Sequence, residues 1–416
     1  VNYITSLASS YGLTVNYTFP MLIEATGTAS AVDNFLAALQ TAPSNVQQWI
    51  LSGECIPLGY FTANSKAPNY KPNIIIVPLP QGMTPQYILQ HAVKINGKPA
   101  FTVLGQPSQQ PTSPIEIWIP WGLEFIYDEL PLFSNGYMGQ GLTIAIVDAF
   151  GDVNFTLASQ YVYQNVACQD LALFSEEFGL PYNPLQCEVI YPTGMPTLTP
   201  YNLGIAEEWS GETALDIEYA HTMAPGAKIL LVVSPTQGDD LFVDIEYVVN
   251  NSLANFISLS WGWPEDYLYY ITSSYNLLYG YDEIFMQAAA EGIGVFAASG
   301  DYGAYDAWIT PMEPSAYYPA SDPWVTGVGG TTLYALLSTP QGYVIRNEYA
   351  WDWNLFLALK NQYKWGTGGG YSFTFPETPG QVLIHIIYER TYVYEPFLGI
   401  GFYTVGHRGV PDIAAD

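Results

Sequence analysis

Four continuous apolar runs, separated by helical patterns, constrain the fold of this chain more than any other feature. The runs are Thr143–Val147, Ile229–Val233, Phe256–Leu259 and Ile293–Ala298, and the helical stretches between them are Glu212–Met223, Asp240–Val249 and Asp282–Ala290. Continuous apolar runs are typical of strands buried on both faces, so the alternation predicts a mainly parallel α/β sheet with helices on both faces. In such sheets active sites lie beyond the carboxyl ends of the strands.

A smaller α/β (α+β) domain is predicted before this sheet, in residues 1–105. Helical spacing covers Val1–Ser10 and Ser30–Thr41, strand patterns cover Thr14–Thr26 and Asn73–Pro78, and a helix is expected over Met83–Ile95. Residues 106–118 form the predicted linker, because their first part is rich in Pro, Ser and Gln. The second domain then covers residues 119–416. Hydrophobic residues make up 49% of the chain, which is ample material for both cores.

The charge of the chain excludes one class of partner and favours an acidic setting. Lys and Arg total 10 and Asp and Glu total 38, giving a net charge of -28. Nucleic acid is excluded because phosphate binding needs clustered basic residues. No apolar stretch of about 18 residues occurs, so no membrane span is expected. Below about pH 3 most carboxylates are protonated, which leaves few charges to repel one another; an ordinary acidic secreted protein is the alternative.

Cysteines and sequons are compatible with secretion. A disulfide between Cys168 and Cys187 fits a secreted protein. Cys55 is then either a buried free thiol or paired outside this chain. Three sequons place candidate glycosylation sites at Asn16, Asn154 and Asn250. The predicted location is therefore extracellular, as an acidophilic glycoprotein.

Glu212 and Asp216 lie in the most informative helical segment, Ser210–His221. We expect Ser210 to cap its N-terminus. Residues four apart lie about 40° apart around a helix axis, so the two carboxyl groups share a face. Neighbouring carboxyl groups share a proton, which raises the pKa of one of them and suits it to acid–base catalysis; a solvated acidic face is the alternative. His221 lies about 180° from Glu212, so we assign it a structural role.

Asp301 follows the apolar run Ile293–Ala298 in a Gly-flanked loop, at the carboxyl end of a predicted strand. A carboxyl group kept protonated there would donate a hydrogen bond to a developing oxyanion. An ordinary Asx turn is the alternative.

The chain resembles the sedolisin (serine-carboxyl peptidase) family in a series of stretches that follow the family's order. They are Ala145–Asp152, the Glu212-x-x-x-Asp216 pair, Ile257–Gly262, Ser299–Gly303, Tyr318–Leu333, the GGGYS stretch with Phe375-Pro376, and Arg408–Ala415. Residues 1–105 resemble the family's pro-segment in SSYGLTVNY and EATGTASAVDNF. The resemblance implies a subtilisin-like fold, endopeptidase activity on protein or peptide substrates at acidic pH, and a pro-segment that inhibits the enzyme within the zymogen.

The resemblance also assigns roles by position. Glu212 matches the family's general base, Asp216 the acid that supports it, and Asp301 the acidic oxyanion donor. The edges that match the substrate cleft are Ser260, Trp261 and Gly262 on one side and Gly368, Gly369 and Gly370 on the other. An extended peptide would add to the first edge by backbone pairing, and the glycines would allow close backbone approach.

One departure from the family concerns the nucleophile, a Ser in a Gly-Thr-Ser motif downstream of the stretch that matches Arg408–Asp412. The chain ends at Asp416 before that motif, and the family's Ca²⁺ site would lie beyond residue 416 as well. Ser299 and Ser372 do not align with the nucleophile, so we interpret both as structural. We therefore expect this chain alone, a pro-form or a fragment, to be inactive, with the C-terminal part as a separate chain among its candidate partners.

Other site chemistries find little support. The four histidines, His91, His221, His385 and His407, are isolated, so neither a metal site nor another cofactor is predicted. The competing interpretation is a non-catalytic, sedolisin-like scaffold in an extracellular surface or filament assembly. A Gly-Thr-Ser motif further along the polypeptide would favour the enzyme.

Overall fold

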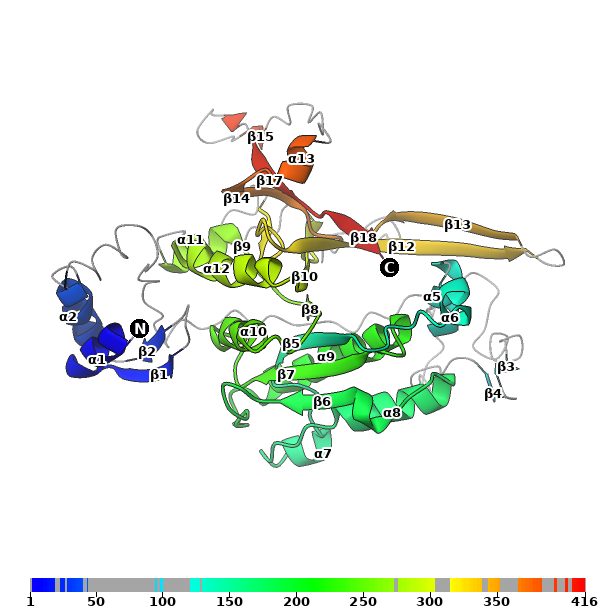
Figure 1. The fold of residues 1–416 in the computed structure, drawn as a ribbon, viewed down its shortest axis with the longest axis horizontal. Coiled ribbons are helices and arrows are strands. Elements are labelled where there is room, and N and C mark those ends of the chain that lie inside the picture. Colours follow the sequence, from blue (N-terminus) through cyan, green and yellow to red (C-terminus); the bar gives the residue numbers. More distant parts are fainter. Residues whose placement is uncertain are drawn as a thin grey trace. The chain divides into compact units, whose positions relative to one another are not determined.

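Two compact units make up the protein, whose structure is a computed structural model (Figure 1). The first unit comprises Val1–Lys66, Phe242–Tyr334 and Asn347–Asp416, and the second comprises Ala67–Leu241 and Ala335–Arg346. The structure describes residues 2–18, 23–26, 28–39, 43, 94–95, 98–99, 120–127, 129–272, 276–303, 315–338, 343–351, 366–383, 393–394, 401–402 and 406–415.

The second unit is built on three parallel strands. β5 (Thr143–Ala149) pairs with β7 (Lys228–Ser234) along its whole length, and β6 (Cys187–Ile190) pairs with the other side of β7. α8 (Ala167–Phe178) packs against α9 (Leu203–Met223), and α9 packs against β5 and β7. The shorter elements are β3 (Lys94–Ile95), β4 (Lys98–Pro99), α5 (Pro120–Ile126), α6 (Leu130–Ser134), α7 (Phe155–Ala158) and the 3-10 helix η1 (Pro184–Gln186).

Parallel strands also form the centre of the first unit. β10 (Gly294–Ala298) lies between β8 (Phe256–Leu259) and β12 (Thr326–Ser338), and β18 (Ile413–Ala415) pairs with β12. Antiparallel pairs join β9 (Trp263–Pro264) to β11 (Tyr317–Tyr318), β14 (Gly370–Pro376) to β17 (His407–Val410), and β15 (Val393–Tyr394) to β16 (Gly401–Phe402). The remaining elements are α11 (Glu265–Thr272), α12 (Asn276–Ala290) and α13 (Pro379–Leu383), with α10 (Asp240–Asn250) from Phe242 onward and β13 (Tyr343–Ala350) from Asn347 onward. The predicted mainly parallel α/β architecture is confirmed.

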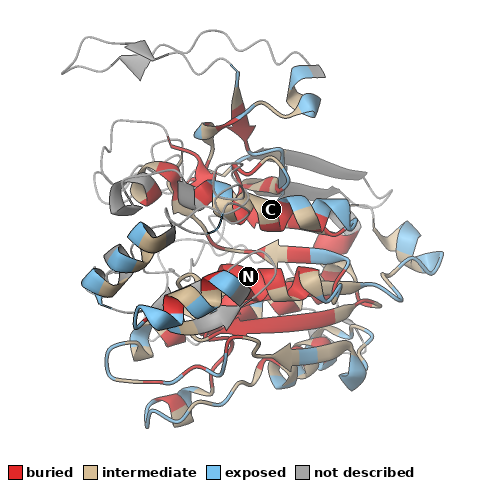
Figure 2. Ribbon diagram, turned by 60° about the vertical axis from the view of Figure 1, so that its left-hand side comes forward, coloured by how far each residue is buried: buried red, intermediate tan, exposed pale blue. Residues whose placement is uncertain are grey.

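The core of the second unit consists of the apolar runs that predicted its strands. Ile146, Ile229 and Leu231 are fully buried, together with Leu171 of α8 and Ile217 of α9. Figure 2 shows this burial as continuous red along the central strands. Strands without an exposed face explain why their sequence is continuously apolar and does not alternate.

The N-terminal residues form two helices and a hairpin. α1 (Asn2–Ser10) packs against α2 (Ala29–Leu39) and β1 (Thr14–Thr18), which pairs antiparallel with β2 (Ile23–Thr26). Both predicted helices are therefore present, and the predicted strand Thr14–Thr26 is two strands.

The rest of the predicted N-terminal domain is described only in short pieces. The predicted helix over Met83–Ile95 is wrong at its end, because Lys94–Ile95 form β3, paired with β4. Residues 83–93, the predicted strand Asn73–Pro78, the linker 106–118 and Cys55 lie outside the described residues. The domain boundary stays a prediction.

α9 begins at Leu203, and the prediction that Ser210 caps this helix is wrong. Asn202 occupies the N-cap position. Residues 203–209 contain no Pro, and Gly204 alone weakens their helix propensity, so the helix continues upstream. Glu212 consequently lies well inside α9, beyond the first turn in which a helix macrodipole favours a charged carboxylate.

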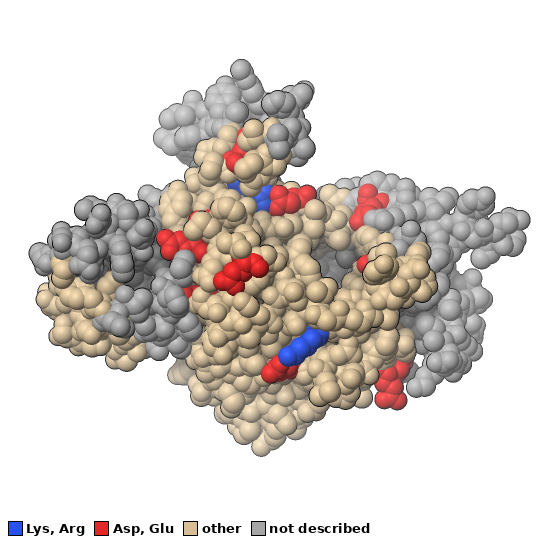
Figure 3. All heavy atoms as spheres, in the orientation of Figure 1, with Lys and Arg blue, Asp and Glu red and all other residues tan. Residues whose placement is uncertain are grey.

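Charged side chains are sparse on the face of the molecule in Figure 3, most of whose described surface is uncharged. Lys228 forms an exposed ion pair with Glu188 in the second unit. None of the described helices has the length and apolar character needed to cross a lipid bilayer.

Candidate active site

Glu212 and Asp216 occupy successive turns of α9 and are both half-buried. Their neighbours Thr213 and Ile217, one position further along, are fully buried against the core of the unit. The helix thus holds the two carboxyl groups at the edge of its buried face, about 40° apart. The predicted placement on one face of one helix is confirmed.

Asp148 is a buried carboxyl group beside this helix to which the sequence analysis gave no role. It lies near the carboxyl end of β5 and is fully buried. Burial raises the pKa of Asp148 to about 7, and the neighbouring hydroxyl of Thr213 of α9 opposes this shift. The strand-end rule that selected Asp301 would also have selected Asp148.

Asp152 is a second buried carboxyl group joined to α9. Its Oδ1 accepts a hydrogen bond from Ser210 Oγ at 2.6 Å, and the same hydroxyl accepts one from Val153 N at 3.0 Å. Ser210 therefore connects the loop after β5 to α9, two residues before Glu212. This tertiary contact explains a polar, fully buried Ser in the helix interior.

His221 is fully buried, with its ring edge-on to Tyr182 at 5.7 Å between centroids. Burial lowers the pKa of His221. An imidazole enclosed in the interior against an aromatic ring agrees with the predicted structural role.

Asp301 lies in the first unit, in the loop that follows β10. Its backbone carbonyl accepts a hydrogen bond from Gly366 N at 2.8 Å, and its side chain is half-buried. Ser299 Oγ donates to Gly368 O at 2.8 Å, and Gly368 N donates to Gly300 O at 2.6 Å. The residues before Gly370 therefore lie directly against the loop that carries Asp301.

Gly368 makes this contact possible. A Cβ at residue 368 would lie 1.9 Å from the carbonyl oxygen of Ser299, closer than any real atom could approach. Gly370 pairs with Val410 at the start of the β14–β17 ribbon. The predicted close backbone approach at the glycines is thus present within the protein; their role in substrate binding stays a prediction.

Ser260, Trp261 and Gly262 follow directly after β8, beyond the carboxyl end of a parallel strand, and their role as an edge of the substrate cleft stays a prediction. Trp261 is nearly buried, edge-on to Phe242 with 5.2 Å between ring centroids and 5.6 Å from Trp263. Its indole is therefore fixed by other aromatic rings, which would hold the neighbouring backbone in place.

Glu265 is a fully buried carboxyl group that the sequence gave no reason to select. It accepts hydrogen bonds from Ser321 Oγ (2.5 Å), Ser372 Oγ (2.7 Å), Phe373 N (2.7 Å) and Thr374 Oγ1 (3.3 Å). Burial raises the pKa of Glu265, and these four donors oppose the shift. The network occupies the hydroxyl of Ser372, in line with the structural role expected for it.

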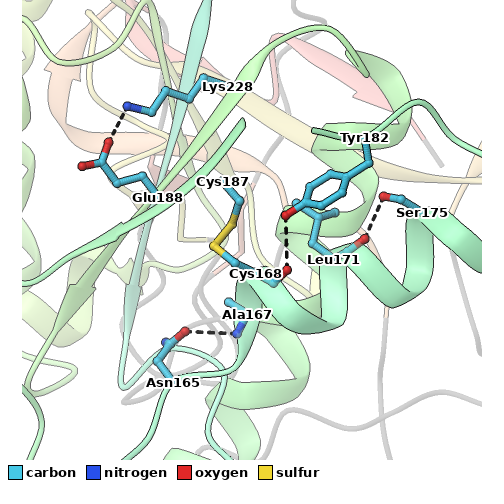
Figure 4. Close-up of a disulfide and its surroundings, with 9 residues drawn as sticks. All are labelled: Asn165, Ala167, Cys168, Leu171, Ser175, Tyr182, Cys187, Glu188 and Lys228. Carbon is cyan, nitrogen blue, oxygen red and sulfur yellow. Dashed lines mark hydrogen bonds and ion pairs between the residues drawn. A yellow bond between two sulfur atoms is a disulfide. The ribbon is translucent and has the colours of Figure 1, made fainter. Parts of the chain in front are cut away.

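The predicted disulfide between Cys168 of α8 and Cys187 of β6 is present, with 5.6 Å between the Cα atoms (Figure 4). Of the sequons, Asn154 is the N-cap of α7, with its Oδ1 accepting from Leu157 N. Asn250 ends α10, where its side chain is hydrogen bonded to Glu246 and Gln287. Asn16 lies in β1. Glycosylation at these three sites stays a prediction.

The structure brings the predicted residues together in two groups. Glu212 and Asp216 belong to the second unit, whereas Asp301, Ser260–Gly262 and Gly368–Gly370 belong to the first. A single cleft that contains both groups stays a prediction. Among the described residues, no group of three or more His, Cys, Asp or Glu side chains is arranged to hold a metal ion.

Comparisons with known proteins connect this arrangement to one family. Kumamolisin from Bacillus sp. (strain MN-32) is 30% identical over 292 residues, which are 68% of this chain and 44% of kumamolisin. The solved structure of Pseudomonas sedolisin, a serine-carboxyl proteinase, superposes with a TM-score of 0.52 and 27% identity over 71% of this chain and 70% of that one. The chain belongs to the sedolisin family.

A further relative supports the same family assignment. Tripeptidyl-peptidase 1 from Rattus norvegicus is 28% identical over 83% of this chain and 55% of its own length. No family model matches the chain. The match to Pseudomonas sedolisin also confirms the predicted subtilisin-like α/β fold. The chain spans about half the length of these two curated peptidases, 44% and 55%.

Proposed function

We propose that this protein is an acid-acting serine-carboxyl endopeptidase whose general base is Glu212. The observation that carries the proposal is the Glu212–Asp216 pair, held at the edge of the buried face of α9 in a sedolisin-like fold. On a solvated acidic face both carboxyl groups would be exposed, whereas Glu212 and Asp216 are half-buried. The substrate is an extended peptide that pairs with the backbone of Ser260–Gly262.

The proposed mechanism gives each carboxyl group a distinct task. Glu212 accepts the proton of a serine hydroxyl while the serine oxygen attacks the peptide carbonyl carbon, and Asp216 supports Glu212 by sharing a proton with it. Asp301, in its protonated form, donates a hydrogen bond to the oxyanion. Glu212 then returns its proton to the leaving amine as the carbon–nitrogen bond breaks.

This mechanism works only at acidic pH, because Glu212 must be ionised while Asp301 still carries its proton. We therefore propose activity in an acidic extracellular setting that falls toward neutral pH as Asp301 ionises. Asp301→Asn keeps a hydrogen-bond donor that does not titrate. Its activity should decline less on the alkaline side than that of the parent; superimposed alkaline limbs would assign that limit to another group.

The proposed serine nucleophile is not assigned to any of these 416 residues, because no Gly-Thr-Ser motif occurs among them. We propose that the 416-residue chain shows no turnover without it, and that residues 1–105 act as an inhibitory pro-segment. The resemblance to the family places its Ca²⁺ site beyond residue 416, so no step of the mechanism is assigned to that ion.

The test is peptidase turnover at pH 3–5 by a polypeptide that contains these residues together with a Gly-Thr-Ser segment. Glu212→Gln should lower kcat by at least about a hundredfold, the range of a general base. Glu207→Gln, the same change elsewhere on α9, should leave kcat unchanged. Equal activities of the parent and Glu212→Gln would remove Glu212 from the mechanism, and an inactive parent would favour the scaffold.

A further inference from the structure

Asp152 is held in a fixed position by the backbone on both sides of it. Phe150 and Gly151 adopt left-handed conformations (φ 60° and 66°) directly after β5. Val166 N, at the N-cap of α8, donates to the carbonyl of Asp152 at 2.8 Å. The side chain is 3% exposed and accepts the 2.6 Å hydrogen bond from Ser210 of α9. Asp152 thus joins three elements: β5, α8 and α9.

Other carboxyl groups face this position from both helices. Asp170, in the first turn of α8, lies close enough to Asp152 for its charge to act on the Asp152 carboxyl group, and Glu218 of α9 is within range of the charges of both. The phenol of Tyr163, which donates to the carbonyl of Phe150 at 2.9 Å, also faces Asp152. None of the described groups that face Asp152 is positively charged.

Ionised carboxyl groups that lie close together repel one another, and each proton that they bind removes one of these charges. Burial raises the pKa of Asp152 to about 7, with an opposing contribution from the hydrogen bond of Ser210 and a further raising one from the charge of Asp170. Burial and the charges of Asp152 and Asp170 raise the pKa of Glu218 to about 8. In acid, therefore, the protons bound by Asp152 and Glu218 remove the repulsion at this site.

We propose that Asp152 is a positioning residue for peptide hydrolysis: through its hydrogen bond with Ser210, and while Asp152 or Glu218 carries a proton, Asp152 holds the middle of α9, and with it Glu212 and Asp216. When that proton is lost, like charges from the β5 loop, α8 and α9 repel one another. The role in hydrolysis rests on the proposed function; the proton-dependent attachment of α9 does not.

The sign of the pH effect follows from the direction of these shifts. A carboxyl group whose pKa is raised by folding stabilises the folded state below its ordinary pKa of about 4, and this stabilisation is lost as the pH rises through the folded value. The attachment of α9 should therefore be complete near pH 4 and lost between about pH 4 and pH 8.

Thermal unfolding of the 416-residue chain between pH 4 and pH 8 tests the attachment. Asp152→Asn keeps an oxygen for Ser210 and offers Asp170 an N–H that does not titrate. Its melting temperature should match that of the parent near pH 4 and exceed it by several degrees near pH 8. The matched control is Glu176→Gln, an exposed acid on α8, whose profile should run parallel to that of the parent.

A profile of Asp152→Asn that also runs parallel to the parent would overturn the proposal. If this variant does not fold at pH 4, the same unfolding measurement on Glu218→Gln tests the proposal instead. It keeps the bond between Asp152 and Ser210 and removes one charge, so it should flatten the profile, and a parallel profile would again count against the proposal.

Kinetics separate a positioning role from a purely structural one. In the longer polypeptide with the serine, and in the Asp301→Asn background so that Asp301 no longer titrates, the alkaline limb of kcat should move to higher pH in Asp152→Asn, with KM nearly unchanged. A change in stability without any movement of that limb would leave Asp152 with a structural role only. If the parent lacks peptidase activity, the proposed function fails, whereas the unfolding experiment still decides whether α9 is attached in a proton-dependent way.

Discussion

At the scale of single residues, a missing side chain decides whether two distant segments of the first unit can meet. Gly368 lies so close to the carbonyl of Ser299 that a Cβ would be 1.9 Å from the oxygen. The atom in the way belongs to the backbone, so no rotamer change relieves the clash. The loop that carries Asp301 therefore requires Gly at residue 368.

Gly368→Ala should lower the free energy of unfolding by about 3 kcal/mol or more, the upper part of the range for overpacking. Gly204→Ala is the control, because a Cβ at this exposed position of α9 would contact nothing within 4 Å. That change should leave stability equal or raise it by up to about 1 kcal/mol. Urea unfolding of the parent and both variants measures the difference, and equal midpoints for Gly368→Ala and the parent would contradict this account.

Glu265 illustrates which residues the sequence does not reveal. It is one acid among 38 acidic residues, and its donors come from Ser321, Ser372 and Phe373, which only the tertiary fold brings together. The Glu212–Asp216 pair could be predicted because both residues belong to one helix, whose period fixes their relation. The relation between two residues of one helix can be predicted from their spacing in the sequence. The partners of Glu265 cannot, because they depend on contacts between distant segments.

At the scale of elements, the strands were predictable and the helix ends were not. The apolar run Ile229–Val233 lies wholly within β7. A strand that is buried on both faces needs an apolar side chain at each position, so the whole strand can be recognised in the sequence. The N-cap of α9 was placed at Ser210, eight positions too late, because a buried Ser resembles a capping Ser in sequence. Its true partner, Asp152, is 58 residues away.

The disulfide between Cys168 and Cys187 joins α8 to β6, the outermost strand of the second unit. It closes a loop with a sequence separation of 19, and a loop of this size stabilises the folded state by about 3 kcal/mol in the chain-entropy model. Replacing both cysteines by Ser should lower the melting temperature by a corresponding amount, on the order of 5–10 °C.

Calorimetry with and without reductant checks this prediction. The reductant should lower the melting temperature of the parent and leave that of the double variant unchanged. Cys55→Ser is the control and should respond to reductant as the parent does. A double variant as stable as the parent would mean that packing between α8 and β6 suffices without the covalent bond.

At the scale of the whole molecule, buried carboxyl groups in both units favour the folded state in acid. The second unit has the cluster around Asp152. In the first, Asp322 is fully buried close to Asp282, and it accepts hydrogen bonds from Trp324 N at 2.9 Å and Tyr318 Oη at 3.4 Å. Burial raises the pKa of Asp322 well above its usual range, and the charge of Asp282 raises it further, while the two hydrogen bonds and then the charge of Arg408 oppose the shift. Two independent sites thus shift stability in the same direction.

The whole chain should therefore be most stable near pH 4 and lose stability as the pH rises toward 8, because each of these groups binds its proton more tightly in the folded state. Asp322→Asn keeps an acceptor for Trp324 N and removes one titrating group. It should raise the melting temperature at pH 8 by several degrees and leave it unchanged at pH 4, whereas the exposed Glu291→Gln should change neither.

Because the cluster around Asp152 still titrates, Asp322→Asn should recover only part of the stability lost at pH 8, and Asp152→Asn combined with Asp322→Asn should recover more than either alone. Maximal stability of the parent at pH 8 would contradict this prediction, since the buried carboxyl groups would then be ionised in the folded protein without cost.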